Sequence, residues 1–187
     1  DKLALPGRLE VTDAEGKTQT LQTKNVIIAS GSVVRPIPGF ETDGKQVVNS
    51  DHILELKDVP KSLIVMGSGA VGCEFASVYS RFGADTTIVE LLPRMVPLED
   101  EEVSKELERS FRKRGIKSVL DTKLEKMEKT ATGVKVTGKN GKGETVSLEA
   151  EMLLVAVGRM PYTQGLGLEG TKIKVEKGFI HVDEFQQ

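Results

Sequence analysis

Apolar residues in this chain form short continuous runs, separated by segments in which apolar and polar residues recur at helical spacing. The clearest runs lie at 62–66 and 152–157, and shorter strand-like segments lie at 86–89 and 116–120. Continuous apolar runs predict strands that are buried on both faces, as in a parallel sheet. An amphipathic segment follows Gly69 and separates 62–66 from 86–89. This part of the chain therefore predicts alternating strands and helices.

Two further helices are predicted, and the longer one lies between the acidic residues 99–102 and Gly115. The apolar stripe of this longer helix consists of Val103, Leu107 and Phe111. Basic residues at 112–114 follow the stripe, where positive charge stabilises the negative end of the helix dipole. Glycine just beyond a helix end is favoured because it adopts a left-handed conformation without strain. The shorter helix is predicted over 51–56, with Ser50 as its N-terminal cap.

The N-terminal residues predict two or three strands. Segments 8–12 and 18–22 flank a turn at 13–16, and a third strand is expected at 25–29. The run 26–31 is apolar until its small-residue end. This third strand is therefore expected to be buried on both faces.

Residues 123–149 alternate in short β-like runs that are broken by glycine-containing turns at 132–133 and 138–143. This spacing predicts an antiparallel meander. The tail at 172–182 has strand character again. The predicted class is therefore α/β, with a parallel sheet and a meander as one of its crossovers.

The most specific motif reads as strand, glycine turn, helix, strand and acid. Gly67, Gly69 and Gly72 form a G-x-G-x-x-G pattern directly after the strand at 62–66. Glu90 ends the next strand 18 positions after Gly72 (90 − 72), close to the roughly 20 residues typical of dinucleotide-binding units. A surface turn followed by a solvated acid is the alternative, but the flanking strand and helix favour a nucleotide site.

Each glycine of this motif has its own physical task. Gly67 permits the tight turn, Gly69 lets the backbone approach a pyrophosphate, and Gly72 lets helix and strand pack closely. The pyrophosphate is expected to bind the free N–H groups at the positive end of the helix. The residues expected at this phosphate site are Gly67, Ser68, Gly69, Ala70, Val71 and Gly72.

Glu90 is expected to accept hydrogen bonds from both hydroxyls of the adenosine ribose. A phosphate on the ribose 2′ position would place two negative groups together, and like charges repel. The motif therefore favours NAD over NADP as the cofactor.

Composition limits the other classes of function. The chain has 187 residues, of which 38% are hydrophobic, and this suits one domain with appendages. A net charge of -2 gives no reason to expect nucleic acid or a membrane surface as a partner, and no apolar run is long enough to span a bilayer. The single cysteine, Cys73, excludes an internal disulfide and is expected to be a small buried hydrophobe. His52 and His181 are isolated from other ligand types, so no metal site is predicted.

Taken together, these motifs resemble the flavoprotein disulfide reductase family of pyridine nucleotide-disulfide oxidoreductases, and most of all its branch that oxidises dihydrolipoamide with NAD. The resemblance covers essentially the whole chain. It is carried by the segments 28–32, 36–39, 50–54, 67–76, 79–83, 89–90 and 156–159, with Pro161. It implies a Rossmann-like three-layer ββα sandwich with a parallel sheet and a β-meander crossover, plus flanking strands from a flavin domain.

The resemblance also implies how the chain is organised. An NAD-binding domain at 41–174 would be inserted into a flavin domain, to which residues 1–40 and 175–187 would belong. The family's flavin-binding glycine motif, redox cysteine pair and catalytic His-Glu pair have no counterpart in this sequence. A fragment of a longer parent is therefore implied. FAD would bind in the full-length parent only, and the fragment alone is expected to be inactive and to supply no catalytic residue.

In such a parent, hydride would pass from reduced FAD to NAD. The implied partners are NAD(H), a second identical subunit, and components of a 2-oxoacid dehydrogenase complex or of glycine cleavage, in a bacterial cytoplasm or the mitochondrial matrix. Related NAD(P)H-dependent reductases of disulfides, mercuric ion or peroxide are alternatives, as is a non-catalytic NAD-sensing module. Some of these relatives use NADP and place arginines where this chain has Leu91 and Leu92, which disfavours NADP, although Arg94 lies nearby.

Four further residues match positions of the family. Glu74 matches an acid that lies near the nicotinamide end of the cofactor in the family. Alternatively, it is an ordinary acid in a first helical turn, where the helix dipole favours negative charge. Gly158 matches a glycine that lets nicotinamide stack toward the flavin, and an ordinary turn glycine is the alternative. Val119 or its neighbour Leu120 is expected to pack against the adenine ring or simply within the core. Arg159 matches the family's Gly-Arg element or is a solvated arginine.

Overall fold

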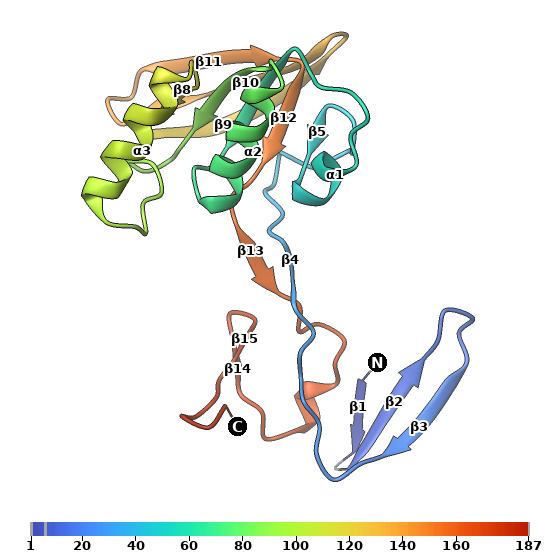
Figure 1. Ribbon diagram of the computed structural model, residues 1–187. Coiled ribbons are helices and arrows are strands. Elements are labelled where there is room, and N and C mark those ends of the chain that lie inside the picture. Colours follow the sequence, from blue (N-terminus) through green and yellow to red (C-terminus); the bar gives the residue numbers. More distant parts are fainter. Residues whose placement is uncertain (1, 6, 187) are drawn as a thin grey trace. The chain divides into compact units, whose positions relative to one another are not determined.

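The computed structural model describes residues 2–5 and 7–186 and contains a five-stranded parallel sheet (Figure 1). All neighbouring strands in this sheet are parallel. In spatial order the strands are β5 (Val47–Val48), β12 (Met152–Val155), β6 (Ser62–Met66), β7 (Asp85–Val89) and β8 (Lys117–Val119). The predicted α/β class with a parallel sheet is confirmed.

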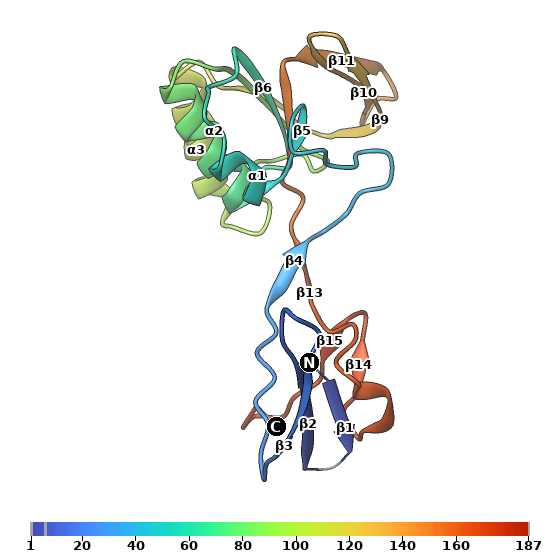
Figure 2. The same ribbon diagram turned by 90° about the vertical axis from the view of Figure 1, so that its right-hand side faces the viewer.

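Helices cover one face of this sheet, and an antiparallel meander lies on the other (Figure 2). The helices are α1 (Ser50–Leu54), α2 (Ala70–Arg81) and α3 (Glu101–Lys113). The meander strands are β9 (Thr122–Thr130), β10 (Gly133–Asn140) and β11 (Thr145–Ala150). The meander connects β8 to β12, so it takes the place of a crossover helix, as expected.

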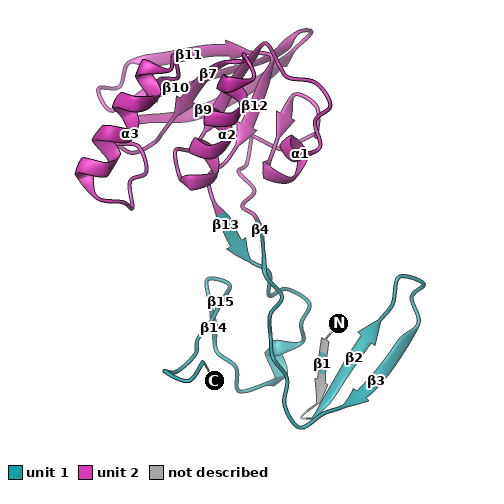
Figure 3. Ribbon diagram, in the orientation of Figure 1, with its two compact units in different colours: residues 1–33, 159–187 teal, residues 34–158 magenta. Residues whose placement is uncertain are grey.

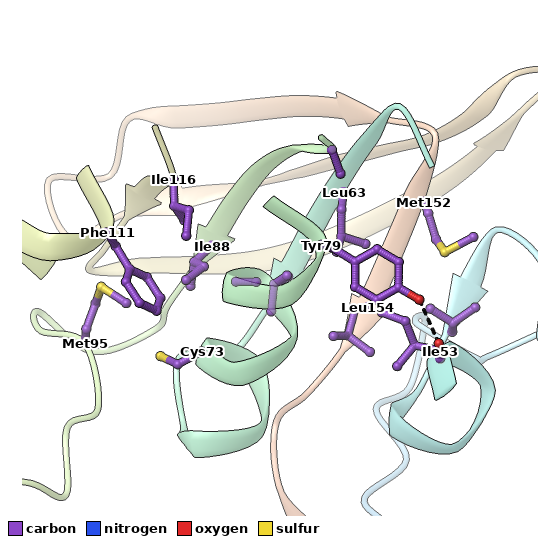
Figure 4. Packing of buried hydrophobic residues seen from close by; sticks show 14 of the residues in the cluster. Ile53, Leu63, Cys73, Tyr79, Ile88, Met95, Phe111, Ile116, Met152 and Leu154 are labelled. Carbon is purple, nitrogen blue, oxygen red and sulfur yellow. Dashed lines mark hydrogen bonds between the residues drawn. The ribbon is translucent and has the colours of Figure 1, made fainter. Parts of the chain in front are cut away.

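Two apolar clusters fill the spaces between the layers, and β6 contributes to both. Leu63 and Val65 belong to the cluster on the helix side, whereas Ile64 belongs to the cluster on the meander side. Successive side chains of a strand point to opposite faces, so a strand between two layers must be apolar throughout. In the helix-side cluster, the Tyr79 hydroxyl donates a hydrogen bond of 2.8 Å to the carbonyl oxygen of Ile53 (Figure 4). This bond links α2 to α1.

Helix α3 has the predicted ends. Asp100 is its N-cap and accepts from backbone N–H groups of the first turn, and Gly115 beyond its C-terminus has a φ of 84°. The predicted apolar stripe is wrong at Val103, which is 55% exposed, whereas Phe111 is buried. Ser104 is buried instead and donates its hydroxyl to the Asp100 carbonyl oxygen. No helix in the described part of the chain is long and apolar enough to cross a membrane.

The predicted cap of helix α1 is wrong by one residue. Asn49, not Ser50, is the N-cap, and its side-chain oxygen accepts from the backbone N–H groups of Asp51 and His52, both at 3.0 Å. The His52 ring accepts from the Asn49 backbone N–H and so completes a capping box. The helix ends at Leu54 rather than at residue 56. Both Asn and Ser are good caps, and this reciprocal contact selects Asn49.

The chain divides into two compact units, one of residues 34–158 and one of residues 1–33 with 159–187 (Figure 3). The parallel sheet, the three helices and the meander all lie in the larger unit. The larger unit begins and ends earlier in the sequence than the range 41–174 expected for the nucleotide-binding domain. The assignment of the outer residues to a flavin domain stays a prediction.

The smaller unit contains short strands. Strands 8–12 and 18–22 form the predicted hairpin, and the tail forms a second hairpin rather than one strand. Arg159 donates to the Ser32 hydroxyl at 2.8 Å and to the Ser32 carbonyl at 2.6 Å, so it is exposed but hydrogen-bonded. The elements are β1 (Lys2–Leu5), β2 (Arg8–Thr12), β3 (Thr18–Gln22), β4 (Ser32–Val34, whose last residue is assigned to the larger unit), β13 (Arg159–Pro161), the 3-10 helix η1 (Leu168–Gly170), β14 (Val175–Glu176) and β15 (Phe179–Ile180).

The third predicted strand of this unit is wrong. Residues 25–29 form no strand, and the Ile27 side chain is 92% exposed. A strand with two apolar faces needs paired neighbours and a covering layer on each side. Within the described residues, no strand pairs with this segment. The chain instead enters β4, which pairs with β13.

Candidate functional site

A cavity of about 720 Å³ opens at the carboxyl ends of β6, β7 and β12. Gly67 follows β6, Glu90 follows β7, and Gly158 lies beyond the end of β12, and all three line this cavity. Parallel strands place their carboxyl ends at one edge of the sheet, and ligands of open α/β sheets bind there. The topology thus brings together three residues that are far apart in the sequence.

Two glycines of the turn are required by the backbone itself. Gly67 has a φ of 104°, and a Cβ at this position would lie 2.5 Å from the carbonyl oxygen of Ala156. A Cβ at Gly72 would collide with the carbonyl oxygen of Gly67 and lie 3.3 Å from a methyl carbon of Val65. Both collisions involve backbone atoms, whose displacement would disturb the neighbouring strand and turn. These glycines therefore permit the turn and the close packing of α2 against β6.

Gly69 differs from these two glycines because a Cβ there would meet no atom within 4 Å. It is the N-cap of α2, and it provides no side-chain acceptor for the N–H groups of the first turn. Gly69, Ala70 and Val71 all line the cavity. The start of α2 thus presents backbone donors and the positive end of a helix dipole to open space, an arrangement that fits a pyrophosphate.

Glu90 is the acid of the cavity wall, and it is only 8% exposed. Its Oε2 accepts from the Ser68 backbone N–H at 2.8 Å and from the Ser68 hydroxyl at 2.7 Å. Its Oε1 accepts from the Leu92 backbone N–H at 2.9 Å. The carboxylate therefore ties the end of β7 to the glycine turn, in addition to facing the cavity.

Residues that the sequence interpretation did not assign form an apolar wall of this cavity. The wall is the segment after Glu90, in which Leu98 is 95% exposed. The Arg94 guanidinium donates to the Pro97 carbonyl oxygen at 2.7 Å, so its side chain holds this segment in shape. The apolar lining residues of the segment are Leu91, Leu92, Val96, Pro97 and Leu98. The available sequence signal was the group of apolar residues around Pro93 and Pro97, directly after a strand-end acid.

The structure brings six of the ten predicted cofactor-binding residues to the cavity: Gly67, Gly69, Ala70, Val71, Glu90 and Gly158. Ser68 and Gly72 are buried behind the turn rather than on its surface. Ser68 reaches the site only through Glu90, and Gly72 only through its packing.

Glu74 and Val119 do not line the cavity. Helix α2 begins at Ala70, so Glu74 lies beyond the first turn, and it is exposed. The expected placement in a first turn is wrong for this reason. Val119 packs against the meander-side cluster, while Leu124 lies in the cavity wall. A role of Glu74 toward nicotinamide and of Val119 toward adenine stays a prediction.

Cys73 is a buried residue of α2, and its thiol donates to the Ser68 carbonyl oxygen at 3.2 Å. Burial, with the nearby negative charges of Glu90 and Glu74, raises the pKa of this thiol to about 11. It is thus a protonated packing residue rather than a nucleophile. Among residues 2–5 and 7–186, no three His, Cys, Asp or Glu side chains are grouped to hold a metal ion.

The family model of pyridine nucleotide-disulphide oxidoreductases matches residues 3–187 of this chain. A dihydrolipoyl dehydrogenase of Chlorobaculum tepidum is 44% identical over 173 residues, which cover 92% of this chain and 37% of that protein. The chain therefore spans less than two fifths of the length of this curated relative.

Solved structures show the same likeness. The crystal structure of LpdA from Mycobacterium tuberculosis is similar with a TM-score of 0.85 and 32% identity, over 94% of this chain and 38% of that one. A Cu(II) complex of the HOCl-induced flavoprotein disulfide reductase RclA from Escherichia coli is similar with a TM-score of 0.82 and 31% identity, over 97% of this chain and 40% of that one. Sequence and fold thus indicate the same group of proteins.

Proposed function

Because the chain belongs to the pyridine nucleotide-disulphide oxidoreductase family, we propose that it is the NAD-binding part of a dihydrolipoamide dehydrogenase. In the parent enzyme, hydride would pass from reduced FAD to NAD during the oxidation of dihydrolipoamide. The dihydrolipoyl dehydrogenase that is 44% identical supports this choice within the family. The chain's share of that relative's length, 37%, fits one domain of a longer enzyme.

One observation carries the proposal: a cavity beside the start of α2 that holds an open glycine and a buried acid. A Cβ added at Gly69 would have no atom within 4 Å. This leaves the open space that a pyrophosphate in contact with the backbone would require. Glu90 lies in the wall of the same cavity and carries the charge that would meet a ribose. Apolar side chains at 91–98 complete a wall that suits a flat aromatic base.

Each group of the chain would have a distinct task toward the bound cofactor. The first-turn N–H groups of α2 would hold the pyrophosphate, and Glu90 would orient the ribose. Gly158, which is exposed and lines the cavity, would leave room for the nicotinamide to meet its reaction partner. When bound, NAD supplies the nicotinamide ring that accepts the hydride. This chain would thus bind and orient the cofactor, and the dithiol chemistry would occur elsewhere in the parent.

The wider setting follows from the same proposal. Residues 1–40 and 175–187 would belong to a flavin domain that binds FAD in the parent, and 41–174 would be the NAD-binding domain. The partners would be a second identical subunit and a 2-oxoacid dehydrogenase complex or glycine cleavage components. The location would be a bacterial cytoplasm or the mitochondrial matrix.

The test of the proposal is thermal unfolding of the 187-residue chain with and without nucleotide. NADH should raise the melting temperature, because a ligand that binds only the folded state stabilises it by about 2.7 kcal/mol at 100 times its Kd. NADPH at the same concentration should raise it less, because Glu90 would repel a 2′-phosphate. A melting temperature that does not respond to millimolar NADH would contradict the proposal.

The chain alone should show no dihydrolipoamide:NAD turnover and should carry no yellow flavin after purification. Dithiol oxidation in this family needs a disulfide-forming cysteine pair, and the chain has one cysteine. Hydride transfer also needs flavin and nicotinamide in close contact. Absorbance at the NADH wavelength measures turnover, with Cys73→Ser as the control. Turnover that survives in this variant, which has no cysteine, would contradict the proposal and would require a redox group other than a cysteine pair.

A second candidate is a flavoprotein reductase with a different oxidant, and the similarity to the flavoprotein disulfide reductase RclA favours keeping it. The NAD-binding geometry is the same for both candidates, so the cavity does not separate them. A redox cysteine pair upstream and a His-Glu pair downstream in the gene sequence would decide for an enzyme of this family over a non-catalytic NAD-sensing module.

A further inference from the structure

Ser68 is the one side chain of the glycine turn that hydrogen-bonds the acid of the cavity. It is completely buried, and it donates both its backbone N–H and its hydroxyl to the same oxygen, Oε2 of Glu90. The two bonds measure 2.8 and 2.7 Å. The hydroxyl does not reach the cavity itself, since Ser68 is not part of its wall. Any effect of this hydroxyl on a ligand must therefore pass through Glu90.

The acceptor capacity of Glu90 limits what it can offer to a ligand. A carboxylate has about four lone-pair positions, two on each oxygen. Ser68 occupies both positions of Oε2, and the Leu92 N–H occupies one of Oε1. One position on Oε1 remains. Displacing the Ser68 hydroxyl would leave a buried donor without a partner, and that is costly.

We propose that Ser68 is a positioning residue that sets nucleotide specificity by holding Glu90 so that only Oε1 can accept from the ribose. This inference rests on the proposed NAD-binding function and changes one expectation drawn from the sequence. Glu90 then receives one ribose hydroxyl rather than both. The carboxylate is also prevented from rotating away from a 2′-phosphate, so the rejection of NADPH depends on Ser68 as well as on the charge of Glu90.

The test compares NADH and NADPH affinities of the 187-residue chain and its Ser68→Ala variant by titration calorimetry. Alanine keeps the backbone N–H bond and removes only the hydroxyl. The ratio of NADH to NADPH affinity should fall roughly three- to tenfold, less than the full value of a bond to a charged group, because Glu90 keeps its two backbone N–H bonds and the lost hydroxyl acts only through its position. Ser77→Ala is the matched control, because Ser77 lies on α2, which follows the turn, and its hydroxyl accepts from the Arg114 guanidinium rather than bonding Glu90.

A double variant separates action through Glu90 from a general effect on folding. Adding Ser68→Ala to Glu90→Ala should leave the affinity ratio of Glu90→Ala unchanged, because the partner of the hydroxyl is already absent. An unchanged ratio in Ser68→Ala alone, an equal loss for both nucleotides, or a further fall in the double variant would overturn the inference. A chain that bound neither nucleotide would overturn the proposed function and the inference together.

Discussion

Replacing Glu90 with alanine should weaken NADH binding by about 1.5–3 kcal/mol, because a hydrogen bond from a ribose hydroxyl to a charged acceptor is lost. NADPH binding should not weaken, and it should improve where the repulsion of the 2′-phosphate is relieved. Titration calorimetry with both nucleotides measures the two effects separately. Equal weakening of both nucleotides would show that Glu90 acts through folding and not through the ribose.

The same substitution has a second expected effect, on folding. Glu90 accepts from the N–H groups of Ser68 and Leu92, and both would lose their partner. The free energy of unfolding should therefore fall by about 1–3 kcal/mol. Urea denaturation without nucleotide measures this change. Glu90→Gln is the comparison variant: it keeps the size and one acceptor oxygen, but its amide NH2 would face the donors of either Ser68 or Leu92, so part of the loss should remain.

Replacing Gly72 with alanine should lower the free energy of unfolding of the larger unit by about 1–3 kcal/mol or more. The added Cβ would overpack the site against backbone atoms, which cannot shift without disturbing the fold. It would collide with the carbonyl oxygen of Gly67 in the glycine turn, which is proposed to bind the nucleotide. Stability and NADH affinity should therefore fall together. Denaturation and nucleotide titration of the same preparation measure both.

Gly69→Ala is the matched control for this prediction. Its added Cβ would meet no protein atom within 4 Å, and its φ of -65° suits alanine, so stability should change little. NADH affinity should nevertheless fall, because the Cβ would occupy the space of the pyrophosphate. If Gly69→Ala destabilised the chain as much as Gly72→Ala, the contrast between a packing glycine and a ligand-facing glycine would be wrong.

The course of the chain from β6 to β7 was readable from local sequence. An apolar run, a glycine turn, a helix and a second run each follow from short-range rules of periodicity and backbone freedom. The start of α2 at Ala70 and the strand-end position of Glu90 agree with the structure for this reason. The same holds for the ends of α3, where a capping acid and a left-handed glycine decide the boundaries locally.

Residues 25–29 show where local rules stop. Their apolar character predicts a buried strand, yet burial depends on neighbours that the described residues do not supply to this segment. Val103 shows the same limit on a smaller scale. It fits a helical stripe by spacing, but the buried face of α3 passes through Ser104 and Phe111, and Val103 remains exposed.

For the site, local sequence was sufficient to identify the glycine turn and the acid, because their chemistry lies within one strand-helix-strand unit. Only the tertiary structure decided what surrounds them. Parallel pairing of β12 with β6 brings Gly158 to the cavity, and the path after β7 places the apolar segment 91–98 in its wall. The bond between Ser68 and Glu90 joins residues 22 positions apart. Such contacts depend on how strands are paired and layers are packed, which no periodicity along the chain encodes.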